Sequence, residues 1–292
     1  MRSEPVILRM RGRVIEWPRR GCVMGILNIN EDSFSGDGRV DAGWAVERAV
    51  AMIGEGADFL DVGAESARTN REAISVDEEL ERFASFAERW GEVVERAEPR
   101  DGEQVWPPVL SANTWRSEVV EGVLEMGYEL VNDMSGLTSA RNAELCAQWG
   151  GALLVMHTVG EPKVDHRHVS WADLGRSMED FFAERIVRCR EAGLSDEQVV
   201  LDPGLGFAKG VEDDLEVFRA LDRLMNFARP ILLPVGRKGF VGEVLGIEEA
   251  SERDAGTMAC VAAGLRRGGS IFRVHEVKGC FEVIKVLEGV GA

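Results

Sequence analysis

The stretch VVLDPGLGF, residues 199–207, contains the unit that decides the fold. It begins with an uninterrupted apolar run, which is typical of a short strand buried on both faces. Asp202 ends the run, and a glycine-rich loop follows before a helix predicted near 213–224. A buried strand, a polar residue at its end, a loop and a helix make one βα unit.

The same unit recurs along the rest of the chain. Buried strands are predicted at 22–29, 58–64, 108–112, 129–132, 152–157, 199–202, 230–235 and 270–274. Helices are predicted near 41–56, 77–97, 115–126, 139–149, 171–193, 213–224, 253–267 and 276–288. A barrel of eight βα units needs about 250 residues, which suits a chain of 292. The alternation also permits an open doubly wound sheet, but eight units without a domain break favour the α/β class with a (β/α)8 TIM barrel.

The first residues of the chain have a different character. The runs VILRM (6–10) and RVIEW (13–17) flank Gly12 and predict a short β-hairpin. We therefore expect an N-terminal hairpin within 1–20 and one barrel domain over 21–292.

The composition excludes several classes of protein. A formal net charge of −17 and a pI of about 4.8 make a surface that repels nucleic-acid backbones. No apolar run approaches the roughly 20 residues of a membrane span, and the first 20 residues do not resemble a secretory signal. Five cysteines without a CxxC pair fit reduced thiols. The sequence therefore predicts a cytoplasmic protein that binds neither nucleic acid nor membranes.

Polar side chains stand at or near the ends of the predicted strands. They are Asn28, Asp61, Asn113, Asn132, His157, Asp202, Lys238, Arg273 and His275. In a (β/α)8 barrel the carboxyl ends of all strands surround one mouth, where substrates bind. A single Asn or Asp in such a place is as often the cap of the next helix, but so many together indicate a shared site.

Three of these side chains have the chemistry to hold a flat heterocycle. Asp202 can accept two parallel N–H bonds from a cyclic guanidine-like edge, such as that of a pterin. Asn132 supplies both a donor and an acceptor. Lys238, between Gly236 and Gly239, can donate to a ring carbonyl, and the alternative is a lysine in solvent.

Two further features indicate an anion and a cation. Arg273 and His275 alternate at the end of the last strand, so both side chains can face one phosphate or pyrophosphate. An ion pair between Arg273 and a neighbouring acidic helix is the alternative. Asn28 opens an oxygen-rich loop, 28–38, that can help to hold Mg²⁺ beside a pyrophosphate. The sequence contains no HExxH, cysteine cluster or GxxxxGK[ST] motif.

Taken in order, these segments resemble dihydropteroate synthase. The matching motifs are MGILNINEDSFS (24–35), DVGAESAR (61–68), VNDMSG (131–136), LDPGLGFAK (201–209), GRKGF (236–240) and RVHEV (273–277). The resemblance runs from about 21 to 288, and the ordered set is far more specific than any one motif. It implies a homodimeric transferase of folate biosynthesis that joins 4-aminobenzoate to a hydroxymethyl-dihydropterin diphosphate and releases pyrophosphate.

The resemblance also implies which residues bind the substrates. Asn132, Asp202 and Lys238 would hold the pterin. Arg68 would help to close the site over 4-aminobenzoate, and Asp61 and Asn113 would complete the predicted substrate-binding set.

The remaining roles concern the leaving diphosphate. By resemblance, Asn28, Arg273 and His275 would take the pyrophosphate together with Mg²⁺, for which Asn28 is the predicted ligand. With Lys238 these three form the predicted catalytic set.

Several positions depart from that family's usual pattern, among them Asn113, Ala67 and Gly236. Asn113 stands where the family usually has Asp, so the site lacks a negative charge that would stabilise a cationic intermediate. Ala67 and Gly236 stand in place of a Thr and a Ser. Two alternatives therefore stay open: a pterin-binding homologue without synthase activity, and a pterin-dependent methyltransferase, which would have no use for the anion site of Arg273 and His275.

Overall fold

The computed structural model describes residues 5–30, 41–65, 73–160, 162–164 and 169–291, and the structural statements below refer to these residues. The strands that form the barrel are β3 (Cys22–Asn28), β4 (Phe59–Gly63), β5 (Val109–Asn113), β6 (Leu130–Asp133), β7 (Ala152–Met156), β8 (Val199–Asp202), β9 (Leu232–Leu233) and β10 (Ile271–Val274). They pair in parallel in the order β8-β7-β6-β5-β4-β3-β10-β9. A parallel bridge between Leu201 and Ile231 joins the two edge strands, so the sheet is a nearly closed barrel.

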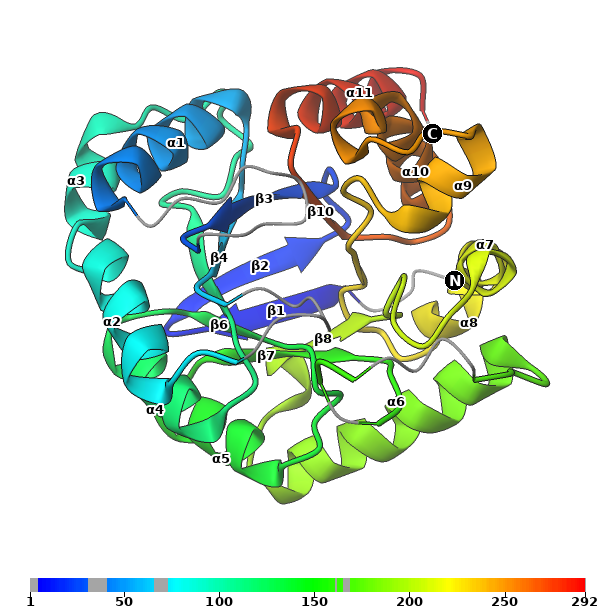
Figure 1. Cartoon of the computed structure of the whole chain (residues 1–292), viewed down its shortest axis with the longest axis horizontal. Helices are drawn as coiled ribbons and strands as arrows, with labels where there is room; N and C mark the ends of the chain where they lie inside the picture. The colour runs from blue at the N-terminus through cyan, green and yellow to red at the C-terminus, as the bar shows by residue number, and fades with distance from the viewer. Residues whose placement is uncertain (1–4, 31–40, 66–72, 161, 165–168, 292) are drawn as a thin grey trace.

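Helices surround the barrel (Figure 1). They are α1 (Ala42–Glu55), α2 (Val76–Ala87), α3 (Trp90–Arg96), α4 (Ser117–Glu125), α5 (Ala140–Trp149), α6 (Leu174–Glu191), α7 (Val211–Arg219), α8 (Leu221–Met225), α9 (Gly239–Leu245), α10 (Asp254–Leu265) and α11 (Val277–Gly289). Helix α1 shows how local sequence sets their ends: Asp41 accepts the Trp44 N–H at 2.7 Å, and Gly56 ends the helix at a φ of 112°. Among the described residues, no helix combines the length and the apolar character needed to cross a bilayer.

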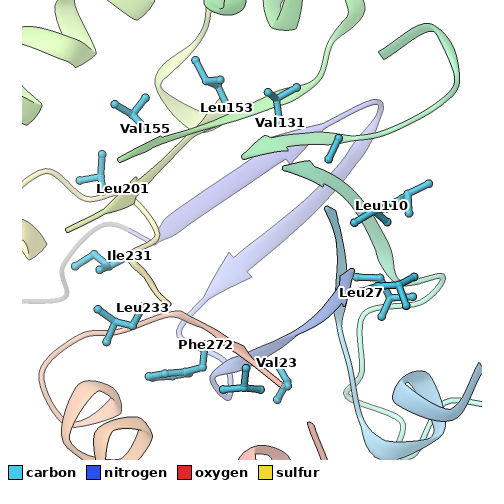
Figure 2. Packing of buried hydrophobic residues seen from close by; sticks show 14 of the residues in the cluster. Val23, Leu27, Leu110, Val131, Leu153, Val155, Leu201, Ile231, Leu233 and Phe272 are labelled. Atoms are coloured by element: carbon cyan, nitrogen blue, oxygen red, sulfur yellow. The ribbon is translucent and has the colours of Figure 1, made fainter. Parts of the chain in front are cut away.

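Side chains along each strand alternate between two apolar cores. On β3, Val23 and Leu27 belong to the core between strands and helices, whereas Cys22 and Met24 belong to the barrel interior. Figure 2 shows the outer core, with side chains from most of the strands pointing toward the helices. Because both faces are buried, the strands read as continuous apolar runs in the sequence.

A β-hairpin closes one end of the barrel. Strands β1 (Val6–Met10) and β2 (Arg13–Trp17) pair antiparallel, and their buried side chains share the interior core with the barrel strands. Arg11 N donates to Gly150 O, and Arg13 Nη1 donates to Pro107 O, both just before a strand begins. The hairpin therefore covers the amino ends of the strands (Figure 1). We call the opposite end, which the hairpin does not cover, the open end of the barrel.

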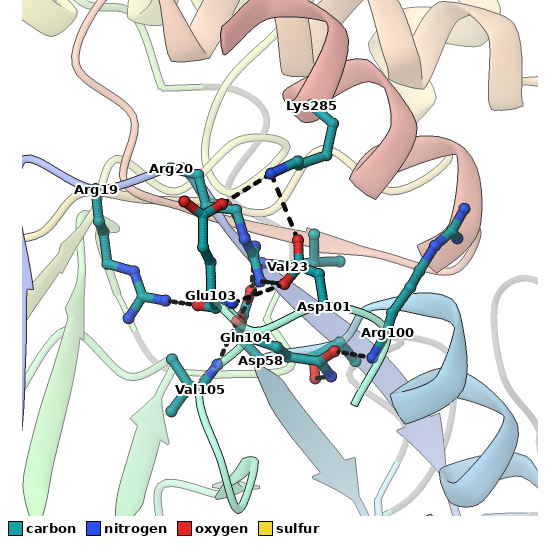
Figure 3. Close-up of polar contacts among 12 residues, drawn as sticks. Arg19, Arg20, Val23, Asp58, Arg100, Asp101, Glu103, Gln104, Val105 and Lys285 are labelled. Carbon is teal, nitrogen blue, oxygen red and sulfur yellow. Dashed lines mark hydrogen bonds and ion pairs between the residues drawn. The ribbon is translucent and has the colours of Figure 1, made fainter. Parts of the chain in front are cut away.

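A buried ion pair lies at the same closed end. Asp58, directly before β4, accepts from Arg20 Nη1 at 2.8 Å and Nη2 at 2.9 Å. It also accepts the backbone N–H groups of Val23 and Val105 at 2.8 and 2.9 Å. Figure 3 shows this carboxylate inside a wider polar cluster that includes Lys285 of α11. Backbone donors and a bidentate guanidinium together satisfy a charge that is fully buried.

The α/β barrel and the hairpin predicted from the sequence are confirmed, with differences in single elements. The helix predicted near 77–97 is two helices, α2 and α3, with a turn at 88–89. The strand predicted at 230–235 forms a ladder only at Leu232–Leu233, because Pro230 and Pro234 have no N–H to donate. Helix α9 lies in a stretch where only a loop was predicted.

Candidate active site

Asp61 is the centre of a polar network inside the mouth of the barrel. It lies in the middle of β4 and is fully buried. Its Oδ1 accepts from Ser111 Oγ at 2.6 Å. Its Oδ2 accepts from Arg273 Nε at 2.7 Å, from Asn132 Nδ2 at 3.0 Å and, weakly, from Asn113 Nδ2 at 3.5 Å. The structure thus brings three predicted site residues together around the carboxylate of a fourth, Asp61.

The strand register explains this convergence. Asp61 stands opposite Ser111 in the β4–β5 pair, and Asn113 stands opposite Asn132 in the β5–β6 pair. Side chains of equal height on parallel strands project into the barrel together. Arg273 reaches the same carboxylate from β10 on the other side of β3, and its side chain is 17% exposed. The guanidinium therefore neutralises the buried charge.

Asp202 forms a second polar centre at the end of β8. The residue is 3% exposed, and its Oδ1 accepts the Gly204 N–H at 2.7 Å. Gly204 has a φ of 72°, and a Cβ there would come within 2.1 Å of His157 O, so only glycine fits. Burial raises the pKa of Asp202 to about 6, against the Gly204 N–H and the Lys238 ammonium, which lower it.

Lys238 faces this second centre from the turn that leads into α9. Its Nζ donates to Leu205 O at 2.7 Å and lies 4.9 Å from the centre of the Phe207 ring. Burial lowers the pKa of Lys238 to about 8, while Asp202 and Asp214 oppose the shift. The predicted pterin residues Asp202 and Lys238 are therefore close enough to interact electrostatically.

The sequence did not identify Lys209 as part of this site. Lys209 is 3% exposed, and its Nζ donates to His157 O and to Phe207 O, each at 3.1 Å. Burial lowers its pKa to about 8, and it contributes to holding down the pKa of Asp202. The available signal was its place in the glycine-rich segment 201–209, where a solvated lysine is unexpected.

The predicted anion residues lie at one end of β10 but face different neighbours. Arg273 is bound to Asp61, whereas the ring of His275 lies beside Gly236. A Cβ at Gly236 would stand 3.2 Å from His275 Cδ2. That the two side chains bind one diphosphate stays a prediction.

Asn28 is the last residue of β3, and its side chain lies against β4. Its Oδ1 is 3.1 Å from the place where a Cβ on Gly63 would stand, so glycine leaves room for it. The described residues contain no group of three or more His, Cys, Asp or Glu suited to a metal. Mg²⁺ often takes only one or two protein oxygens and completes its shell with water and substrate phosphates. The single amide oxygen of Asn28 fits this way of binding Mg²⁺. The described residues do not supply a full set of protein ligands for a metal ion.

Some predicted positions lie outside the described residues. These are Arg68 and Ala67 in the second loop, and their roles stay predictions.

Comparison with known proteins gives consistent results. A family model described as pterin binding enzyme matches residues 24–275. Dihydropteroate synthase of Escherichia coli strain K12 is 34% identical over 270 residues, which cover 91% of this chain and 90% of the relative. Dihydropteroate synthase of Synechocystis sp. is 32% identical over 279 residues, with 95% and 92% covered.

Solved structures show the same likeness. The structure of Yersinia pestis dihydropteroate synthase with a sulfonamide drug complex superposes with a TM-score of 0.86, at 30% identity and 98% coverage of both chains. The Xanthomonas albilineans dihydropteroate synthase with 4-aminobenzoic acid superposes with a TM-score of 0.83, at 29% identity, covering 98% of this chain and 99% of that one.

Proposed function

The chain belongs to the pterin-binding enzyme family, and we infer that it is a dihydropteroate synthase, a transferase of folate biosynthesis. It joins 4-aminobenzoate to 6-hydroxymethyl-7,8-dihydropterin diphosphate and gives 7,8-dihydropteroate and pyrophosphate. The observation that carries this inference is the buried carboxylate of Asp202 beside Lys238 at the open end of the barrel. A carboxylate in that setting accepts two N–H bonds from a pterin edge, and an ammonium beside it donates to the ring carbonyl.

Asn132 supports the same assignment. Its Nδ2 is held by Asp61 at 3.0 Å, which fixes the orientation of its amide. An amide fixed in this way presents a defined donor or acceptor to ring nitrogens. Asn132 is 5% exposed, so it lies deep enough to meet a ring inserted into the mouth of the barrel.

For the diphosphate we propose Asn28, Arg273 and His275, together with Mg²⁺. Arg273 binds Asp61, and its charge also lowers the pKa values of Asp202 and Lys238. Bound Mg²⁺ would neutralise charge on the leaving diphosphate.

The chemical step exchanges one bond for another at the pterin methylene carbon. The C–O bond to the diphosphate breaks, and the oxygen takes the electron pair as pyrophosphate leaves. The nitrogen lone pair of 4-aminobenzoate forms the new C–N bond, and that nitrogen then loses a proton to water. Arg273 stabilises the charge that develops on the leaving group, and the hairpin-closed end keeps bulk water from entering the barrel behind the ring.

One alternative has a specific observation in its favour. Asn113 is an amide that donates to Asp61, not a second carboxylate, so the site holds one negative charge less than the family's usual pattern. This favours a homologue that binds the pterin but does not catalyse the transfer. The variants Arg273→Lys and Arg273→Ala distinguish a synthase from a methyltransferase. In a synthase they should strongly weaken binding of the pterin diphosphate and hardly change binding of a plain pterin.

Turnover by the purified protein tests the proposal. With both substrates and Mg²⁺ we expect pyrophosphate release that requires 4-aminobenzoate, and dihydropteroate as the second product. A known synthase assayed in parallel is the positive control. If the control is active and this protein binds pterin diphosphate without releasing pyrophosphate, the non-catalytic alternative is correct.

We further propose a cytoplasmic homodimer that binds these small molecules and neither nucleic acid nor membranes. The five cysteines form no disulfide, as expected in a reducing compartment. Val286 on α11 and Val290, directly after that helix, are 65% and 68% exposed and suit an apolar contact between copies. Sedimentation equilibrium should give twice the mass of the chain, and a monomer at micromolar concentration would contradict the dimer.

A further inference from the structure

Four charged side chains form a third polar cluster at the open end of the barrel. They are Glu65, Glu79, Arg116 and Lys163, which we call the rim cluster. Lys163 Nζ lies 2.8 Å from Glu65 Oε1, and Arg116 Nη2 lies 3.3 Å from Glu65 Oε2. Arg116 Nε donates to Glu79 Oε2 at 2.8 Å. The Glu65 and Glu79 side chains are almost fully buried, so the two cations neutralise two charges that water does not reach.

The rim cluster joins segments that are not neighbours in the sheet. Glu65 lies two residues past the end of β4, and Lys163 lies in the connection between β7 and α6. Strands β5 and β6 stand between β4 and β7 in the sheet, so the Glu65–Lys163 ion pair joins segments that follow strands that are not neighbours. Arg116, in the β5–α4 loop, also forms an ion pair with Glu65.

The rim cluster also holds the backbone of neighbouring residues in place. Glu65 Oε1 accepts the Ile74 N–H at 3.1 Å, and Arg116 Nη1 donates to Ile74 O at 2.6 Å. Lys163 has a φ of 63°, a left-handed conformation that a lysine adopts only where its surroundings hold it. The chain is thus held at three places on the rim, at residues 65, 74 and 163.

The position of the rim cluster along the barrel axis separates it from the pterin residues. Asp61 and Asn132 project from within their strands, whereas Glu65 stands four residues beyond Asp61. Glu65 lies past the carboxyl end of β4, so the rim cluster lies nearer the entrance. Because the hairpin closes the other end, a nucleophile must reach the bound pterin from the entrance.

We propose that Glu65 and Lys163 are positioning residues for the second substrate. The proposal rests on the synthase function. It adds residues that contact neither the pterin methylene carbon nor the nitrogen of 4-aminobenzoate. Their ion pair ties the segment after β4 to the β7–α6 connection, and Arg116, bound to the same Glu65, adds the segment after β5. That arrangement sets the affinity for 4-aminobenzoate and leaves the deeper pterin site unchanged.

Substitutions at Lys163 separate the charge from the backbone. Lys163→Met removes the ammonium, Lys163→Gly removes it while suiting the left-handed φ, and Lys163→Arg keeps a cation. We expect Met and Gly to raise the KM for 4-aminobenzoate about tenfold, the effect of losing one partly buried ion pair. The Kd for pterin diphosphate should stay within about twofold of the wild-type value, and Arg should restore most of the KM.

Lys285→Met is the matched control. Lys285 also binds a glutamate, Glu103, at 2.8 Å, but it does so at the closed end of the barrel (Figure 3). The Lys285→Met variant should leave both the KM for 4-aminobenzoate and the Kd for pterin diphosphate unchanged. The proposal is wrong if Lys163→Gly behaves as wild type, if Lys163→Arg fails to restore the KM, or if Kd for the pterin rises as much as the KM.

A second readout does not depend on turnover. Glu65→Gln keeps an amide oxygen for Ile74 but removes the charge that attracts Lys163. We expect hydrogen exchange of the Lys163 and Val164 amides to become faster in Glu65→Gln and Lys163→Met, and not in Lys285→Met. Unchanged exchange in both rim variants would overturn the positioning role. A wild-type protein without turnover would instead contradict the synthase function.

Discussion

Asp61 and Asp202 show how the same residue type serves two purposes within one barrel. Asp61 accepts from Ser111, Asn132 and Arg273, so its charge is satisfied by the protein. Asp202 accepts the Gly204 N–H, and burial raises its pKa to about 6. A buried carboxylate with a raised pKa at the end of a strand is typical of a binding or catalytic group. Asp61 therefore organises the site, and Asp202 is the group that we expect to meet the ligand.

The pKa values of Asp202 and Lys238 predict a bell-shaped pH profile. Below about pH 6 protonated Asp202 loses its acceptor pair, and above about pH 8 neutral Lys238 loses its charge. We expect kcat/KM for the pterin diphosphate to be highest between these values. In Lys238→Arg the fall above pH 8 should become smaller, because a guanidinium stays protonated while Lys209, whose pKa is also about 8, still titrates. A profile that is flat from pH 5 to 9 would contradict the assignment.

Replacing Asn113 by Asp tests the electrostatics around Asp61. The Asn113 Nδ2 lies 3.5 Å from Asp61 Oδ2, and two carboxylates at that distance repel by about 5 kcal/mol at an effective dielectric constant of 20. Arg273 offsets part of this, so we expect Asn113→Asp to lower the free energy of unfolding by about 1–2 kcal/mol at pH 7.5.

The sign of the pH dependence follows from the same repulsion. It raises the folded-state pKa of one carboxyl above its unfolded value, so protonation favours the folded state and the loss shrinks toward pH 5. Denaturant titrations at the two pH values measure this. Equal stability of Asn113→Asp and wild type at pH 7.5 would show that the two side chains do not face each other.

At the residue scale, the identity of the site was predictable but its contacts were not. Asp202 and Lys238 stand out in the sequence because each interrupts or follows an apolar run. That Asp61 binds Asn132 depends on the stagger of three strands, which no local pattern determines. Lys209 was missed because its burial between two backbone carbonyls arises only when the loop folds back on His157.

The turn between β9 and α9 shows how two elements constrain one residue. Gly236 N donates to Arg273 O at 3.1 Å, which holds the turn against the end of β10. A Cβ at Gly236 would stand 3.1 Å from Val274 Cα and 3.3 Å from Arg273 O. Both are backbone atoms, so the strand itself would have to shift. This close packing explains why glycine is accommodated here, where a serine would be tight.

Gly236→Ser should therefore affect both stability and anion binding. We expect a loss of about 1–2 kcal/mol in the free energy of unfolding and weaker pyrophosphate binding, because His275 must move away. Gly239→Ser is the control, since a Cβ there meets no atom within 4 Å. Denaturation and calorimetry measure the two effects. A Gly236→Ser protein with wild-type stability and wild-type pyrophosphate affinity would contradict the packing argument.

Elements were the most predictable level of the structure. Continuous apolar runs identified each strand of the barrel because a parallel sheet is buried on both faces. One exception has a cause that is visible in the sequence, because Pro230 and Pro234 shorten β9. The turn at 88–89 does not, because neither of its residues is Gly or Pro. Helix α9 is only seven residues long, too short to show a helical period.

At the scale of the whole molecule, the residues that stabilise the fold and the residues that bind the ligand lie at opposite ends of the barrel. The hairpin and the Arg20–Asp58 pair close the amino ends of the strands, and the polar centres lie at the carboxyl ends. This division is typical of (β/α)8 enzymes. It implies that a change at the closed end should alter folding without altering the affinity of the folded protein for its ligand.

Arg20→Met tests this division. It leaves the Asp58 carboxylate buried without its cation, and we expect a loss of about 3–5 kcal/mol in the free energy of unfolding. Burial already raises the pKa of Asp58, and Arg20 opposes that rise. Without Arg20 the folded protein takes up a proton at higher pH, so the loss should be larger at pH 8 than at pH 5.

A matched change on the surface is the control for this prediction. Arg96→Met removes exposed ion pairs with Glu47 and Glu92 and should change the unfolding free energy far less than Arg20→Met does. If Arg20→Met costs no more than Arg96→Met, the buried pair does not stabilise the closed end. If it lowers pterin affinity in the folded protein, the two ends are not independent.

Calorimetric titration with the pterin diphosphate, in the presence of Mg²⁺, tests the central claim most directly. We expect one site per chain, with affinity lowered at least a hundredfold in Asp202→Asn, which cannot accept two N–H bonds from the pterin edge. Unfolding curves recorded alongside should show that the variant remains folded. Wild-type affinity in Asp202→Asn, or no binding to the unaltered protein, would contradict the account of a pterin site at the open end of the barrel.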